Sequence, residues 1–220
     1  MAKRRKKWDV RKVLVFSTLS AVVVLTAVFL FLGNFVFHSG DVQTSAGNSG
    51  KTLEKPDITE DFLTPNTYSR PQIPLKNIKG VVIHYTANPG STAKENRDYF
   101  DGLKKQTSED GTKASSHFIV GIKGEIIQCI PLEEIAYCSN ERNEDTVSIE
   151  CCHEDETGEF SDATYESVVW LTAWLCKTYG IKKKKVIRHY DVTGKDCPRY
   201  FVKHPDAWKQ LKKDVFALVD

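Results

Sequence analysis

The chain has 220 residues, of which 40% are hydrophobic and 27% are charged, a composition that excludes global disorder and allows one domain with an appendage. Its formal net charge of +2 conceals a basic cluster in residues 1–12, and the remainder of the chain is mildly acidic. A mildly acidic domain has no general attraction for polyanions, so we expect no nucleic acid partner.

An uncharged, apolar stretch at residues 13–37 comes directly after the basic cluster. As a helix it is long enough to cross a hydrocarbon core of about 30 Å. We therefore predict a transmembrane anchor, with residues 1–12 as a basic cytoplasmic tail and everything after residue 37 outside the cell membrane. A cleaved signal peptide is the alternative, because Thr44-Ser45-Ala46 offers a poor small-residue cleavage site.

The next part of the chain lacks a regular apolar period. Residues 38–56 are rich in Gly, Ser and Thr, and Pro65, Pro71 and Pro74 discourage regular helix in residues 57–75. We therefore predict that residues 38–75 are a flexible stalk and lead-in, and that residues 76–220 are the folded domain.

Strand and helix patterns alternate from residue 80 onwards. Short β-branched or apolar runs predict strands at residues 80–85, 117–122, 125–130, 147–152 and 185–190. Helical spacing and capping signals predict helices at about residues 92–105, at 162–179 and from Pro205 to about Leu218. This alternation predicts an α/β fold, a single layered domain with a central mixed β-sheet flanked by helices.

Two potential metal ligands lie near the end of the last predicted strand. His189 lies at the strand end, and Cys197 is eight residues further on, across a loop. Such a loop can bring imidazole and thiolate to one point, and catalytic zinc sites combine three protein ligands of these kinds with an open position. A strand-end histidine and an incidental cysteine would fit this pattern equally well.

Four sequence blocks make the chain resemble a known family. They are VVIHYTA at 81–87, SSHFIVGIKGEIIQCIP at 115–131, SIE at 148–150 and HYDVTGKDCP at 189–198. Their order and spacing resemble the type-2 N-acetylmuramoyl-L-alanine amidases, whose superfamily includes peptidoglycan recognition proteins and amidase-type phage endolysins. The resemblance covers roughly residues 76–218 and implies that His84, His189 and Cys197 bind one zinc ion.

The resemblance also implies a reaction, the hydrolysis of the amide bond between N-acetylmuramic acid and L-alanine in peptidoglycan. Glu150 and Lys195 match residues that are catalytic in several relatives. A glutamate can take a proton from water and pass it to the leaving amine, and a lysine can stabilise the developing oxyanion. As alternatives, Glu150 could be an ordinary strand-end carboxylate, and Lys195 could be a solvated loop residue.

Other residues have weaker assignments. Tyr85 and Asn88 come after the first ligand and are candidates for the substrate groove. His117 matches a family histidine that is not a zinc ligand, and it fits equally well as a wall of the substrate site or as a core histidine. We expect His153 and His204 to be surface or capping residues.

The chain departs from its relatives at Ala136-Tyr137-Cys138-Ser139, where many of them carry a Trp-His pair that contacts substrate. The cysteines also leave a question open. Cys151 and Cys152 are adjacent on a predicted strand and should point to opposite faces. With Cys197 reserved for zinc an odd number remains, so both disulfides and free thiols are compatible with the sequence.

Three functions compete. The first is the zinc amidase, anchored in the cell membrane of a Gram-positive bacterium and acting on its peptidoglycan. The second is a non-catalytic peptidoglycan-binding module, a class that commonly loses the cysteine ligand. The third is a structural zinc site, which would need a fourth ligand such as Asp191 or Asp196. No sequence signal indicates an oligomeric state.

Overall fold

The computed structural model of this protein describes residues 53–220. The predicted cytoplasmic tail, the predicted anchor at 13–37 and the stalk up to residue 52 lie outside the described residues. Within residues 53–220, no helix is both long enough and apolar enough to cross a membrane.

A six-stranded mixed sheet forms the centre of the domain, in the order β1-β4-β3-β5-β2-β6. β3, β5, β2 and β6 run parallel to one another, whereas β4 is antiparallel to β3 through the predicted hairpin. The strand bounds are Thr59–Glu60 (β1), Gly80–Tyr85 (β2), Phe118–Val120 (β3), Ile126–Gln128 (β4), Thr146–Cys151 (β5) and Val186–Arg188 (β6). The predicted mixed sheet is therefore confirmed.

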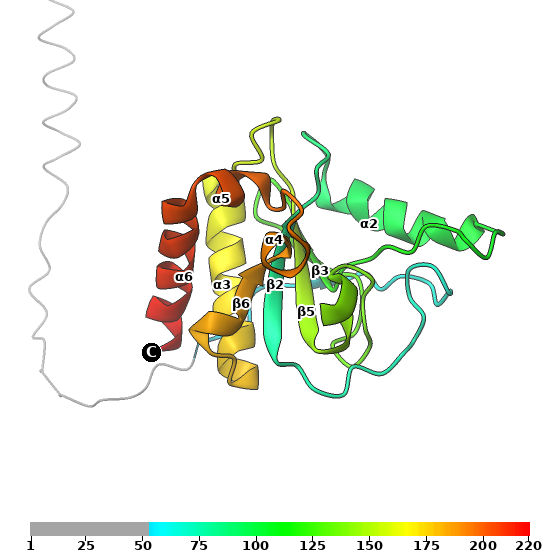
Figure 1. Ribbon diagram of the computed structural model, residues 1–220, viewed down its shortest axis with the longest axis horizontal. Helices are drawn as coiled ribbons and strands as arrows, with labels where there is room; N and C mark the ends of the chain where they lie inside the picture. Colours follow the sequence, from blue (N-terminus) through cyan, green and yellow to red (C-terminus); the bar gives the residue numbers. More distant parts are fainter. Residues whose placement is uncertain (1–52) are drawn as a thin grey trace, which may run out of the picture. The chain divides into compact units, whose positions relative to one another are not determined.

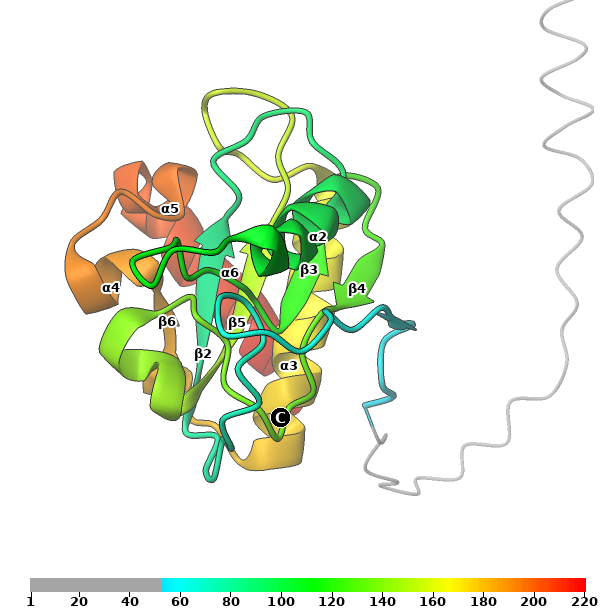
Figure 2. The same cartoon turned by 90° about the vertical axis from the view of Figure 1, so that its right-hand side faces the viewer.

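Helices cover both faces of this sheet (Figures 1 and 2). The long helices α3 (Asp162–Tyr179) and α6 (Pro205–Val219) pack against each other, and α3 contacts β2, β3 and β5. α2 (Ala93–Gly102) lies on the opposite side and contacts β3 and β4. The shorter helical segments are α4 (His189–Thr193), α5 (Arg199–Lys203), η1 (Leu103–Lys105), η2 (Asn140–Glu144) and η3 (Lys183–Lys185).

Alternating side chains divide the core into two parts, one on each face of the sheet. Phe118 and Val120 of β3 join the cluster beneath α3, whereas Ile119 between them joins the cluster beneath α2. Cys151 and Cys152 are divided between the same two clusters, which confirms that they point to opposite faces. This division results from the two-residue period of a strand.

The helix ends agree with the capping signals in the sequence. Thr92 and Glu95 form the predicted capping box at the start of α2. α3 ends at Gly180, whose φ of 65° is the left-handed conformation that glycine adopts without steric penalty.

Residues 57–75, which the sequence placed before the folded domain as a lead-in, belong to that domain. β1 pairs with β4, and Leu63 is 1% exposed in the cluster beneath α2. Arg70 then binds Glu134 through two hydrogen bonds of 2.9 and 2.7 Å. The prolines prevented helix as expected, but isolated leucines in this segment still bury their side chains against the domain.

Candidate metal centre

Three predicted site residues lie at the carboxyl ends of neighbouring parallel strands, and a fourth lies in a nearby loop. His84 is near the end of β2, and Glu150 is its register partner on β5. His189 comes immediately after β6, because this strand ends at Arg188 and not at residue 190 as predicted. Cys197 lies in the loop between α4 and α5. Ligand and active sites of open α/β sheets gather at this edge.

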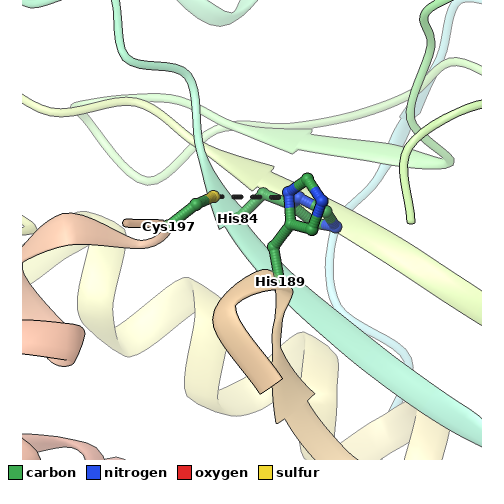
Figure 3. Close-up of side chains that lie close together, drawn as sticks. All are labelled: His84, His189 and Cys197. Carbon is green, nitrogen blue, oxygen red and sulfur yellow. Dashed lines mark hydrogen bonds between the residues drawn. The ribbon is translucent and has the colours of Figure 1, made fainter. Parts of the chain in front are cut away.

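His84, His189 and Cys197 converge as the resemblance implied (Figure 3). Cys197 Sγ lies 3.9 Å from His84 Nδ1, and the centroids of the two imidazole rings are 4.7 Å apart. One ligand atom from each of the three residues lies within 4.8 Å of the other two. All three side chains are buried.

The three side chains fit a zinc ion in spacing and in chemistry. Ligand atoms in a tetrahedral zinc site lie roughly 3.5 Å apart, so the observed spacing requires only a small adjustment. Burial, the neighbouring His189 and the charge of Lys195 hold the pKa of His84 well below its usual range, and burial also lowers the pKa of His189. Both imidazoles are thus neutral, which is the form that binds metal. Burial raises the pKa of Cys197 to about 12, so its thiolate needs a nearby cation.

The group of possible metal ligands has three members and not four. Within residues 53–220, no fourth histidine, cysteine or carboxylate joins the group of His84, His189 and Cys197. Asp191 instead pairs with Arg188 at 2.6 Å, and Asp196 faces Arg199 at 3.5 Å. The two candidate ligands of a structural zinc site are therefore engaged elsewhere. The remaining group supplies three ligands, the number that catalytic zinc sites combine with an open position.

Glu150 places a carboxylate beside this group. Its Oε1 accepts a hydrogen bond from Cys138 Sγ at 3.6 Å, and its Oε2 is buried without a partner among the described residues. Burial raises the pKa of Glu150 to about 8, although the Cys138 hydrogen bond and the Lys195 charge oppose the rise. A bound divalent cation would add to that opposition and favour the ionised form. A buried carboxylate that has no partner and lies near the carboxyl end of a strand is typical of a functional group.

Lys195 is exposed on the loop that joins His189 to Cys197. Its charge lowers the pKa of both histidines, so it lies close enough to act electrostatically on the site. It can therefore present a positive charge from the solvent side.

The candidate substrate residues have different environments. Tyr85 is buried between the His153 ring, at 5.1 Å, and the guanidinium of Arg199, at 5.7 Å. Asn88 is exposed on the loop after β2. The structure therefore leaves Asn88 accessible to a ligand, whereas the Tyr85 ring is mostly covered by protein.

His117 lies in the core and not on a wall of the site. It is 0% exposed, its Nδ1 accepts a hydrogen bond from the Ser148 backbone N–H at 3.1 Å, and its Nε2 lies 3.0 Å from the Glu134 carbonyl. Of the two interpretations of His117, the structure thus favours the core histidine. The expectation for His153 was wrong, because it is 1% exposed beneath the Tyr85 ring. His204 is exposed, as expected.

Sequence reasoning missed three consecutive residues of the site. Cys138, Ser139 and Asn140 contact Glu150, His84 and His189 respectively. The sequence showed that residues 136–139 depart from the family pattern. It did not show which residues of the site Cys138 and Ser139 contact. All six cysteines are free thiols, which answers the question of disulfides.

Comparisons with known proteins agree with this geometry. The sequence model of a family described as N-acetylmuramoyl-L-alanine amidase matches residues 74–200, a range that contains every residue of the site. N-acetylmuramoyl-L-alanine amidase CwlL of Bacillus licheniformis is 34% identical over 178 residues, which are 74% of this chain and 47% of that protein. The amidase BlyA of Bacillus subtilis is 31% identical over 181 residues, 73% of this chain and 47% of that protein. The chain thus spans about half the length of the curated relatives it matches.

Solved structures resemble the domain as a whole. The catalytic domain of XlyA is 27% identical, with a TM-score of 0.59, over 73% of this chain and 99% of that domain. A mutant endolysin from Bacillus subtilis is 28% identical, with a TM-score of 0.59, over 72% of this chain and 98% of that chain. PlyL shares the fold, at 23% identity and a TM-score of 0.60, over 73% of this chain and 97% of that chain.

Proposed function

Because this chain belongs to the N-acetylmuramoyl-L-alanine amidase family, we propose that its domain hydrolyses the amide bond between N-acetylmuramic acid and L-alanine in peptidoglycan, with one zinc ion as cofactor. One observation carries the proposal. His84, His189 and Cys197 converge, and Glu150, whose Oε2 is buried without a partner among the described residues, belongs to a second group that shares His84.

His84 Nδ1, His189 and Cys197 Sγ would hold the zinc ion. The chemistry that zinc supplies when bound is Lewis acidity, which polarises an amide carbonyl and lowers the pKa of water to about 7. Amide hydrolysis needs in addition a group that takes a proton and returns it to the leaving nitrogen. Glu150 Oε2 can do both, because no protein donor among the described residues competes for its lone pairs.

Lys195 would supply the remaining charge. A positive group near the scissile carbonyl stabilises the oxyanion as it forms, and the effect is large where water is partly excluded. Lys195 is exposed and flanked by Gly194, so its ammonium can reach a bound substrate from the solvent side. Asn88 is exposed on the loop after β2 and would contact the muropeptide.

The test uses the full-length protein in detergent, mixed with purified peptidoglycan with and without a zinc chelator. New amino groups on L-alanine are labelled and counted, and new reducing sugar ends are counted in parallel as the product of a glycosidase. We expect amino groups to appear without reducing ends, and we expect the chelator and Cys197→Ala to abolish them.

A wall-binding module without catalysis would give a different result. In that case zinc-loaded protein would sediment with peptidoglycan but release no amino groups. The complete ligand set and the presence of Glu150 argue against this alternative, since non-catalytic relatives commonly lose the cysteine.

We also propose that residues 13–37 anchor the enzyme in the cytoplasmic membrane of a Gram-positive bacterium, with the domain outside. The support is the sequence alone, an apolar stretch of spanning length after a basic segment. Amino-terminal sequencing of the protein from salt-washed membranes tests it. A start within residues 1–12 would support the anchor, whereas a start near Ala46 in the culture medium would show cleavage.

A further inference from the structure

Three consecutive residues, Cys138 to Asn140, each contact a different residue of the metal site. Ser139 Oγ lies 3.1 Å from His84 Nε2, and Asn140 Oδ1 lies 3.2 Å from His189 Nε2. The preceding Cys138 holds Glu150 through its thiol. One short segment therefore touches both imidazole ligands and the carboxylate beside them.

Hydrogen bonds to its backbone fix this segment in place. The side-chain carbonyl of Asn143 accepts hydrogen bonds from the backbone N–H groups of Cys138, at 3.0 Å, and Ser139, at 2.6 Å. The Ser139 carbonyl accepts another from the Arg142 N–H at 2.9 Å. Asn140 adopts a left-handed backbone conformation with φ of 53°, which asparagine tolerates better than most residues. The segment can thus impose an orientation on the groups it contacts.

The contact of His189 selects one form of its imidazole, and the contacts of His84 are compatible with the same form. A neutral imidazole carries its proton on one nitrogen and a free lone pair on the other. The side-chain oxygen of Asn140, Oδ1, can only accept a hydrogen bond. His189 therefore donates from Nε2, which leaves the lone pair of its Nδ1 free. In His84, Nε2 faces the Ser139 hydroxyl, which can accept a hydrogen bond from an Nε2–H group, and Nδ1 faces Cys197. When Nε2 donates to Ser139, the Nδ1 lone pair is free on the side of Cys197.

We propose that Ser139 and Asn140 are positioning residues, which hold His84 and His189 as Nε2–H tautomers and so present both Nδ1 atoms to the metal ion. This proposal depends on the proposed function in one respect, which is that the bound ion is zinc. Partners of this kind fix the ring orientation of a ligand, and their loss typically weakens metal binding about 10- to 100-fold.

Four variants of the full-length protein test the proposal. Ser139→Ala removes the hydroxyl, and Asn140→Gly removes the carboxamide without straining the left-handed backbone. Asn140→Asp is the conservative variant, because a carboxylate keeps the acceptor that His189 needs. Ser116→Ala is the matched control, since this serine is also buried but donates to the Phe118 and Ser148 carbonyls instead.

Two readouts are independent of catalysis. Long-range ¹H–¹⁵N correlation spectra of metal-free, ¹⁵N-histidine-labelled protein identify the protonated nitrogen of each ring, and competition with a chromophoric chelator measures the zinc Kd. We expect Nε2–H for both rings in the wild type, and a zinc Kd raised about 10-fold or more by Ser139→Ala and by Asn140→Gly. Asn140→Asp and Ser116→Ala should keep a Kd close to that of the wild type.

Nδ1–H forms in the wild type, or unchanged zinc Kd values in both Ser139→Ala and Asn140→Gly, would overturn the proposal. A failure of the proposed function would look different, because zinc would bind and the tautomers would be as expected while no amino groups were released from peptidoglycan. The tautomers are measured without metal, so the spectra identify the protonated nitrogens even in a protein that binds no zinc.

Discussion

His84 and Glu150 are register partners on the adjacent parallel strands β2 and β5. The first side chain is a predicted metal ligand and the second is the predicted proton acceptor, and both lie at the carboxyl edge of the sheet. Their spacing is therefore set by the strand ladder itself and not by a flexible loop. A site built on paired strands holds its groups to the narrow tolerance that catalysis requires.

The Glu150 carboxylate should be essential for turnover but dispensable for metal binding. Glu150→Gln keeps the shape of the side chain and removes its ability to take a proton. We expect the rate of amino-group release from peptidoglycan to fall by about 10²- to 10⁴-fold. The zinc Kd should rise much less than in Cys197→Ala, because Glu150 is not one of the three proposed ligands. A variant that retained near wild-type turnover would show that another group carries the proton.

Zinc should stabilise the folded protein through Cys197. A ligand at 100 times its Kd adds about 2.7 kcal/mol, which for a domain of this size raises Tm by roughly 5–11 °C. Differential scanning calorimetry with zinc and then with excess chelator measures this shift. Cys197→Ala should abolish the zinc-dependent rise in Tm. Cys176→Ala removes a different buried thiol, in α3, and should lower the Tm of the metal-free protein but keep the rise. Equal shifts in the two variants would contradict the assigned ligand set.

The Lys195 charge should act on the transition state. Lys195→Met keeps the length of the side chain, and we expect kcat to fall by about 10²-fold with a smaller change in KM, as for the loss of an oxyanion donor. Lys203→Met, at an exposed lysine of α5, is the control and should leave kcat unchanged. If both variants behaved alike, Lys195 would be a solvated loop residue.

His117 should make the domain less stable in mild acid. Burial lowers its pKa from the usual 6.5 to about 4, so the unfolded chain binds more protons between these values. Stability from this group is then fully present above pH 6.5 and is lost as the pH falls towards 4, by about 3 kcal/mol. Urea unfolding at several pH values should show a steeper loss for the wild type than for His117→Gln. Parallel curves would mean that His117 does not carry this dependence.

The lead-in should behave as part of the folded domain. Leu63→Ala empties a fully buried position and should lower the free energy of unfolding by about 2–5 kcal/mol. Ile73→Ala is the control in the same segment, because its side chain is 46% exposed and should contribute little. Urea unfolding distinguishes the two variants. An unchanged free energy of unfolding in Leu63→Ala would mean that residues 57–75 do not contribute to the stability of the domain.

Local pattern alone predicted most of the regular elements. The apolar run at residues 80–85 became β2 with every side chain buried, and the predicted span of α3 at 162–179 was confirmed to the residue. These elements are encoded by short-range periodicity and by caps such as Thr92 and Gly180, which a single sequence displays. The three residues that converge at the site, His84, His189 and Cys197, were also named from sequence, because their blocks resemble a known family in order and spacing.

Contacts between distant segments required the tertiary structure. Strand order and register bring Glu150 opposite His84 and place His117 in the core. The loop that leads to β5 sets Ser139 and Asn140 against the two imidazoles. No periodic pattern encodes such meetings, since each depends on how segments 30 to more than 50 positions apart pack together. The sequence by itself determined the elements and the type of chemistry, and the packing of the sheet decided which side chains could act together, because burial and register are properties of the whole fold.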